Sequence, residues 1–167
     1  QLRRYEDSIQ AYDRALALDP NNVMAWINKG SELNKLGRYQ EVIQVYDRAL
    51  ALDPNNASGW SDRGFALNKL GRYQEAIQAY DRALALDQNV AITWNNKGLA
   101  LGNLGRYQEA IQAYDRAVAL DPNYMIAWNN KGTILVNLGR YQEALPEFDR
   151  VLALDPNNAR VWNNKGS

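Results

Sequence analysis

Hydrophobic positions recur along this chain at helical spacing and in a fixed order. In the segment 71–87, Tyr73, Ile77, Tyr80 and Leu84 fall at i, i+4, i+7 and i+11, so they form one stripe along a helix. Close copies of this segment begin every 34 residues, at Gly37, Gly105 and Gly139, with a further copy over 3–19 that lacks the glycine. A period of this length indicates a stacked array of repeats.

A second apolar pattern precedes each copy. Trp60, Gly64 and Leu67 lie at i, i+4 and i+7, which predicts another helix. The tryptophans are again 34 residues apart, at Trp26, Trp60, Trp94, Trp128 and Trp162. Because the first stripe is too narrow to form a core alone, we expect this helix to cover it, its glycine allowing close approach at about 1 kcal/mol of helix propensity. Each period is therefore predicted to be a helix hairpin.

Glycine, proline and asparagine mark the expected helix ends. Leu70 and Gly71 lie between the two helices of one period, where glycine can adopt the left-handed conformation that ends a helix. Proline and a capping asparagine are placed to end one period and begin the next in Asp-Pro-Asn-Asn segments at 19–22, 53–56 and 155–158. Pro146 is the exception, because it falls inside the last second helix and is expected to kink it.

The order Trp, Gly, Leu, Gly-x-Tyr, Ala, aromatic, Ala and Pro within each period resembles the tetratricopeptide repeat. The resemblance implies an all-α fold, a right-handed superhelical solenoid of antiparallel helix hairpins. With Trp60 at repeat position 4, we expect a single array over 1–167. Its predicted parts are a partial repeat 1–22, full repeats 23–56, 57–90, 91–124 and 125–158, and a partial repeat 159–167.

The amino-acid composition limits which activities and partners this chain is expected to have. The chain has 19 basic and 19 acidic residues and contains neither histidine nor cysteine. The balanced charge gives no indication of a nucleic-acid partner. Most carboxylates recur once per period, which is typical of a structural role, so we expect no enzyme activity, no metal site and no cofactor. No apolar run or leader pattern predicts membrane contact, and a soluble, cytoplasmic protein is the working expectation.

Positions where the copies differ point to a binding face. Repeat positions 2, 5, 9, 12 and 13 vary, and they share one face of the first helix, opposite the Trp-Gly-Leu side. In arrays that this chain resembles, that face lines a concave groove that binds extended peptides. The resemblance therefore implies a protein-protein interaction scaffold with a protein or peptide ligand.

Asparagine dominates position 6, beside the variable face, at Asn28, Asn96, Asn130 and Asn164, with Asp62 in the remaining copy. This asparagine ladder resembles that of some superhelical tetratricopeptide arrays, where carboxamides hold a peptide main chain. The alternative is that these residues only solvate an exposed face. Apolar side chains at Phe65, Ile92, Leu99 and Ile126 suggest pockets among the asparagines, or else packing between neighbouring first helices. The candidate peptide-binding residues are Asn28, Asp62, Phe65, Ile92, Asn95, Asn96, Leu99, Ile126, Asn129 and Asn130.

Two further expectations concern charge. The two-carboxylate clamp of some cochaperones needs basic residues at positions 2 and 5, where only Arg160 is basic, so acidic chaperone tails are not expected ligands. Position 7 is always basic and position 25 always aspartate, and we expect these two series to pair across a helix interface, contributing about 0 to 1 kcal/mol per pair.

Self-assembly is the alternative function. The segment 159–167 supplies repeat positions 1 to 9, and the segment 1–22 supplies positions 13 to 34. Trp162 of one molecule could therefore pack on the stripe of Tyr5, Ile9 and Tyr12 of the next, in a head-to-tail contact.

Overall fold

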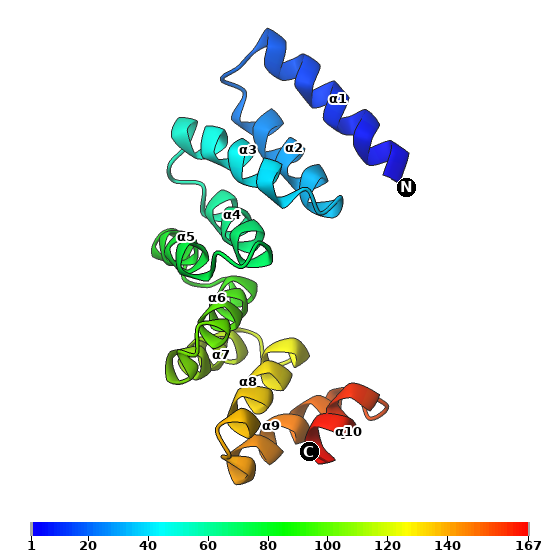
Figure 1. Ribbon diagram of the computed structural model, residues 1–167, viewed down its shortest axis with the longest axis vertical. Helices are drawn as coiled ribbons and strands as arrows, with labels where there is room; N and C mark the ends of the chain where they lie inside the picture. Colours follow the sequence, from blue (N-terminus) through cyan, green and yellow to red (C-terminus); the bar gives the residue numbers. More distant parts are fainter. Residues whose placement is uncertain (1, 167) are drawn as a thin grey trace. The chain divides into compact units, whose positions relative to one another are not determined.

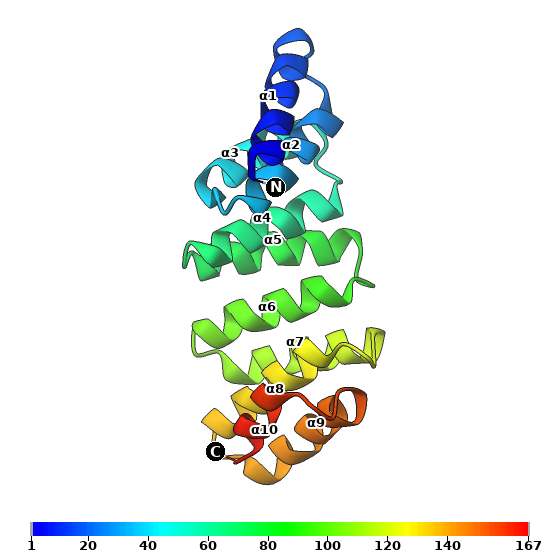
Figure 2. The same ribbon diagram turned by 90° about the vertical axis from the view of Figure 1, so that its right-hand side faces the viewer.

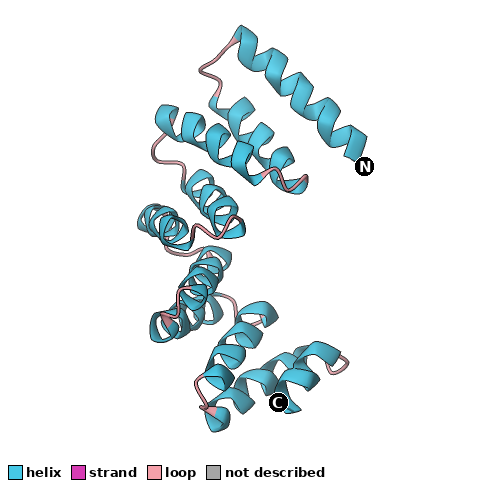
Figure 3. Ribbon diagram, viewed as in Figure 1, coloured by secondary structure: helices cyan, strands magenta, loops and turns pink. Residues whose placement is uncertain are grey.

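The computed structural model describes residues 2–166 as helices joined by short loops, and no strand occurs within that range (Figure 3). The chain divides into two compact units, Gln1–Gln88 and Asn89–Ser167, which we call unit 1 and unit 2. The division falls close to the repeat boundary predicted between 57–90 and 91–124. The predicted repeat limits themselves stay a prediction.

Unit 1 contains the helices drawn from blue to green in Figure 1. Successive helices pack against one another, so that two hairpins follow a leading helix. Their bounds are α1 (Leu2–Leu18), α2 (Val23–Lys35), α3 (Tyr39–Leu52), α4 (Ala57–Lys69) and α5 (Tyr73–Leu86).

Unit 2 also contains two hairpins, but here a short helix follows them and lies against the last hairpin (Figure 2). The bounds are α6 (Ala91–Asn103), α7 (Tyr107–Leu120), α8 (Met125–Asn137), α9 (Tyr141–Leu154) and α10 (Ala159–Gly166). Pro146 lies within α9, which nevertheless has the same 14 residues as α7. The proline therefore does not end the helix.

The turn inside each hairpin has the predicted glycine geometry. Gly71 has φ 76°, and its N–H donates to the Asn68 carbonyl at 3.1 Å, while the Arg72 N–H donates to the Leu67 carbonyl at 2.9 Å. The same positive φ occurs at Gly37, Gly105 and Gly139. These bonds satisfy carbonyls at the end of the first helix and reverse the chain into the second.

Two side chains fix the loop between periods. The Asn56 carboxamide oxygen accepts from the Gly59 N–H at 2.8 Å and so caps α4, as predicted. The Trp60 indole N–H donates to the Pro54 carbonyl at 2.9 Å, six residues back. The same tryptophan bond is made by Trp26, Trp128 and Trp162. The loop is thereby tied to the first turn of the helix that follows it.

An aromatic ring packed on glycine forms the centre of each hairpin. Tyr114 is 1 % exposed, and a Cβ placed on Gly98 would lie 2.7 Å from its ring. Since real Cβ atoms do not approach so closely, only glycine permits this packing, as the sequence pattern predicted. The equivalent pairs are Gly30 with Tyr46, Gly64 with Tyr80 and Gly132 with Phe148.

The predicted pairing of positions 7 and 25 is confirmed where both residues lie in one unit. Each first-helix cation contacts the aspartate of the preceding second helix at 2.5–2.7 Å, and its own tryptophan ring at 5.4–5.9 Å. The pairs are Lys29 with Asp13, Arg63 with Asp47, Lys131 with Asp115 and Lys165 with Asp149. These contacts join one repeat to the next.

Of the helices that the structure describes, none combines the length and apolar character that crossing a bilayer requires.

Candidate functional site

The candidate site is the first-helix face of each unit, which we define as repeat positions 2, 5, 6, 9, 12 and 13 of α2 and α4 in unit 1 and of α6, α8 and α10 in unit 2. Within unit 1, α2 and α4 lie side by side, and within unit 2, α6 lies beside α8. The face is therefore built from helices of successive repeats. Its chemistry differs between the two units.

In unit 1 the face carries a half-buried carboxylate. Asp62 on α4 accepts a hydrogen bond from the Tyr46 hydroxyl at 2.7 Å. Burial raises the pKa of Asp62, although the bond from Tyr46 acts in the opposite direction. Burial also raises the pKa of Tyr46, and the Asp62 charge adds to this effect. Asn28, one repeat earlier, is half-buried as well.

Phe65 is engaged in packing within unit 1. Its ring meets that of Tyr39 edge to face, with centroids 6.2 Å apart, and the Lys69 ammonium lies 5.2 Å from its centroid. Such an arrangement is favourable for aromatic pairs and for a cation over a ring. Phe65 therefore packs against a second helix, α3, and not between neighbouring first helices, and its contribution to a ligand pocket stays a prediction.

In unit 2 the predicted apolar residues of this face are exposed. Ile92 is 55 % exposed, Leu99 39 % and Ile126 57 %. These side chains stand on α6 and α8 among the asparagines. An exposed aliphatic side chain beside polar groups can contact the side chains of a bound peptide.

The asparagines of unit 2 bond to one another between repeats. The Asn130 amide donates to the Asn95 side-chain oxygen at 3.1 Å, and the Asn164 amide donates to the Asn129 oxygen at 3.0 Å. Asn95 also donates to the Asn96 oxygen at 3.3 Å. Asn95 and Asn129 are buried, at 4 % and 7 % exposure. Asparagine at these positions thus links adjacent first helices, a role that the sequence analysis did not predict.

This linkage leaves complementary groups on the face. A carboxamide offers two N–H donors and an oxygen with two acceptor sites. Within the described part of the chain, the side-chain nitrogen of Asn129 has no partner, and neither has the side-chain oxygen of Asn130. One free donor and one free acceptor therefore lie on consecutive residues of α8, which is what a peptide unit requires.

A pocket opens on this face in unit 2. It has a volume of about 160 Å³, and its lining residues from the predicted set are Ile126, Asn129 and Asn130. The others, which the sequence analysis did not select, are Met125, Val151, Asn158, Arg160 and Val161. We call it the α8–α10 pocket.

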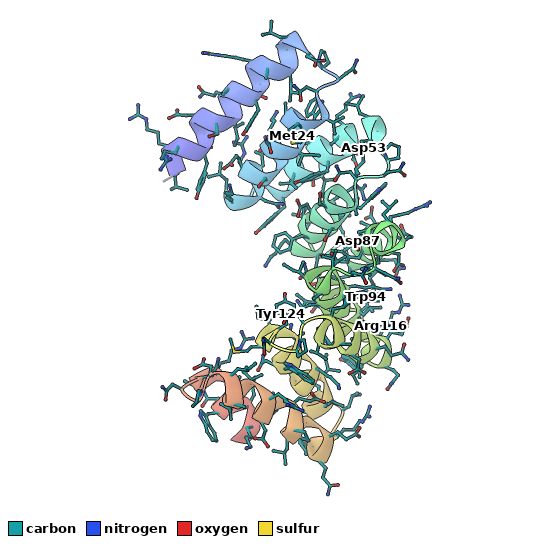
Figure 4. All side chains as sticks on the ribbon, turned by 180° about the vertical axis from the view of Figure 1, so that it is seen from behind. Met24, Asp53, Asp87, Trp94, Arg116 and Tyr124 are labelled. Atoms are coloured by element: carbon teal, nitrogen blue, oxygen red, sulfur yellow. The ribbon has the colours of Figure 1, made fainter. Side chains whose placement is uncertain are left out.

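Larger grooves occur away from the first-helix face. Trp94 and Arg116, labelled in Figure 4, line a groove of about 460 Å³ between α6 and α7. Trp60 and Arg82 line a groove of the same volume in unit 1. The acidic and basic side chains of both grooves are nearly balanced, and none of the candidate residues lies there. Over residues 2–166, no three acidic side chains gather as they would around a metal ion.

The profile of the tetratricopeptide repeat family matches the whole chain, in overlapping segments 1–57, 35–91, 62–124, 95–159 and 129–167. The chain belongs to the tetratricopeptide repeat family. The predicted all-α solenoid of helix hairpins is thereby confirmed, and tetratricopeptide repeat proteins are generally non-enzymatic scaffolds for protein-protein interaction.

Solved structures of tetratricopeptide repeat proteins agree with this assignment. A crystal structure of MamA is 27 % identical, covers 93 % of this chain and 91 % of its own, and gives a TM-score of 0.88. MamA from residue 41 to its end, from Desulfovibrio magneticus RS-1, is 25 % identical with coverages of 95 % and 90 % and a TM-score of 0.87. YrrB, described as a TPR protein with an unusual peptide-binding site, is 26 % identical with coverages of 95 % and 81 % and a TM-score of 0.80. No curated protein sequence matches this tetratricopeptide repeat chain.

The structure brings together part of the predicted site of this tetratricopeptide repeat protein. Ile126, Asn129 and Asn130 meet at one pocket, and Asn95 and Asn96 contact each other beside them. Head-to-tail self-association, the alternative function, stays a prediction. Arg160 is not among the predicted site residues, because its place beside Ile126 depends on the offset between repeats, which sequence spacing alone does not give.

Proposed function

We propose that this protein binds an extended peptide segment of a partner protein along its first-helix face, with asparagine carboxamides holding the peptide main chain. The observation that carries this proposal is the pair of unused polar groups on Asn129 and Asn130. They offer a donor and an acceptor side by side, next to the exposed aliphatic side chain of Ile126. Main-chain contacts of this kind are independent of the ligand's sequence.

The side chains around the carboxamides would supply selectivity. In unit 2, Ile92, Leu99 and Ile126 favour apolar residues of the ligand. In unit 1, the negative charge of the Asp62 carboxylate favours a basic residue of the ligand. The bond from Tyr46 holds this half-buried carboxylate in place, where water screens its charge only partly. YrrB, which has the same fold, is described as having a peptide-binding site, which supports a ligand of this class.

A peptide array tests the proposal. The probes are peptides of random sequence. The affinity of each hit is measured for the wild-type protein and for the Asn96→Ala, Asn130→Ala double variant. We expect most hits to weaken by about tenfold or more, because each lost hydrogen bond contributes about 0.5 to 1.5 kcal/mol. Hits whose affinities are all unchanged would remove the carboxamides from the site.

A matched control separates binding from folding. Asn130→Ala also leaves the buried Asn95 oxygen without its donor, which should lower stability. The control variant Asn123→Ala, Asn157→Ala removes two exposed carboxamides from inter-repeat loops, where only the backbone N–H groups bond to aspartate. Thermal unfolding of both variants shows whether each was folded at the temperature of the array experiment.

A further inference from the structure

The α8–α10 pocket has a repeat-specific construction. Its floor is apolar, formed by Val151 of α9 and Val161 of α10, which are 1 % and 2 % exposed. Three other repeats place the smaller Ala49, Ala83 or Ala117 where Val151 stands. The larger floor residues make this junction chemically different from the others along the chain.

The size of the pocket restricts what can enter. A volume of about 160 Å³ is several times the roughly 30 Å³ that a water molecule occupies in the liquid. It is smaller than the roughly 300 Å³ at which pockets for drug-sized ligands begin. One aliphatic side chain fits these limits. Ile126, 57 % exposed at the rim, would lie against it.

The polar groups around the pocket are fixed in position. The Asn158 oxygen accepts from the Val161 N–H at 3.3 Å, and its amide donates to Asp155 at 2.9 Å, so both the oxygen and the nitrogen of this side chain are held in place. Asn129 and Asn130 are each held by one side-chain bond to a neighbouring repeat, and both line the pocket. The first-helix face therefore offers a main-chain contact directly beside the apolar floor.

The pocket also carries a positive charge, on Arg160. Arg160 is the only charged residue among those lining the pocket, and within residues 2–166 it forms no ion pair or hydrogen bond. Lys131 and Lys165, the nearest cations on the same helices, are both held by aspartates. An exposed guanidinium without a partner favours a carboxylate, which it can bind with two parallel hydrogen bonds.

We propose that the α8–α10 pocket is a specificity subsite that takes one aliphatic side chain of a peptide and, beside it, a carboxylate on Arg160. This proposal rests on the proposed function and specifies the chemistry of the peptide that binds there. The carboxylate belongs either to an acidic residue next to the aliphatic one or to the free C-terminus of a peptide that ends there. Only one cation is present, so a single carboxylate suffices.

Nuclear magnetic resonance titration of the full ¹⁵N-labelled chain tests the subsite. The probes are a blocked heptapeptide with a central Leu-Glu pair, the same peptide with alanine for leucine or with glutamine for glutamate, and a peptide ending in free leucine. We expect the Leu-Glu peptide to shift the side-chain amide signals of Asn129 and Asn130. Alanine for leucine should weaken binding about tenfold, from the lost apolar burial.

Two arginine variants locate the carboxylate. Arg160→Gln should weaken the Leu-Glu peptide about two- to fivefold and leave the glutamine peptide unchanged. Arg150→Gln removes another exposed arginine, on α9 and outside the pocket lining, and should change neither affinity. If the peptide with free C-terminal leucine also responds to Arg160→Gln, the carboxylate can come from a chain end.

Several outcomes would overturn the subsite. These are the absence of Asn129 and Asn130 shifts at millimolar peptide, equal binding of the leucine and alanine peptides, or equal effects of Arg160→Gln and Arg150→Gln. Array hits that weaken in the Asn96→Ala, Asn130→Ala variant would then leave the proposed function standing without this pocket. An array without such hits would remove both.

Discussion

At the scale of single residues, repeat position 6 shows what one departure from the repeat pattern does. Asp62 stands where the other copies have asparagine, and it accepts from Tyr46, whereas Asn130 and Asn164 donate to the preceding repeat. Asp62 could not make the second kind of bond, because position 5 of the preceding repeat is Ile27, which has no polar side-chain atom. A local change of one residue thus alters the bonding across a repeat boundary.

Asp62→Asn should stabilise the protein near neutral pH. Burial raises the pKa of Asp62, so the charged carboxylate costs free energy that a neutral carboxamide, which can still accept from Tyr46, does not. We expect a gain of about 1 kcal/mol at pH 7. A carboxyl with a raised folded-state pKa stabilises the fold when protonated, so the gain should shrink as pH falls through that pKa and vanish below the ordinary aspartate value of about 3.9.

Urea denaturation of both proteins from pH 3 to 8 measures this difference. Asn28→Asp, which introduces the same charge one repeat earlier, is the reverse control and should destabilise at pH 7. A difference between Asp62→Asn and wild type that does not depend on pH would contradict the account.

Gly98→Ala should destabilise by at least about 2 kcal/mol, because the new methyl group would overlap the buried Tyr114 ring. Gly166 is the matched control, since it occupies the same repeat position and a Cβ there meets nothing within 4 Å. Gly166→Ala should be neutral or stabilising by up to about 1 kcal/mol through helix propensity. Equal effects of the two substitutions, measured by thermal and urea unfolding, would show that the ring contact is unimportant.

At the scale of the helix, local spacing predicted most of what the structure shows. The glycine turns, the asparagine caps and the pairing of positions 7 and 25 each depend on residues close in sequence or on one fixed helix contact. The bond from Asn130 to Asn95 was not predicted, because it joins residues 35 apart and depends on how far one hairpin is displaced along the next. A signal existed, since asparagine at position 5 is followed by asparagine at position 6 of the next repeat in both bonded pairs.

Helix α9 offers a test of backbone strain. Pro146 has no N–H to donate to the Gln142 carbonyl, and the corresponding exposed residues in earlier repeats are Gln44, Gln78 and Gln112. Pro146→Gln should stabilise the protein by up to about 3 kcal/mol, and Gln112→Pro should destabilise it by a similar amount. Chemical denaturation of the pair measures this, and a Pro146→Gln variant no more stable than wild type would mean that α9 has already relieved the strain.

At the scale of the whole molecule, the contacts between repeats are nearly interchangeable. Asp13 pairs with Lys29 and Asp47 pairs with Arg63, in the same geometry. Asn22 and Asn56 cap the helices that follow them in the same way. Removing 23–56 would therefore join Asn22 to Ala57 and bring Asp13 to Arg63 without any unmatched group.

Deletion of 23–56 should leave a folded, cooperative protein with a urea m-value lower by about one fifth, because less surface is exposed on unfolding. Circular dichroism and urea denaturation measure both properties. Deletion of 23–55, one residue shorter, leaves an extra asparagine before α4. Asn56 then still caps α4, but Trp60 lies seven residues after the loop proline instead of six, so the tryptophan no longer fits the loop that it ties. We expect this variant to be clearly less stable, and equal stability of the two deletions would contradict this interpretation.

The tryptophan that ties each inter-repeat loop has a consequence for the gene. Trp26 and Trp60 hold the loops before them through identical hydrogen bonds. A duplicated period that includes its loop therefore contains both partners of this bond. Unequal recombination between near-identical coding segments would add or remove whole periods without disturbing the fold. Mutation is then free to diversify the variable face of each copy, because those positions do not form the bonds that hold the loop.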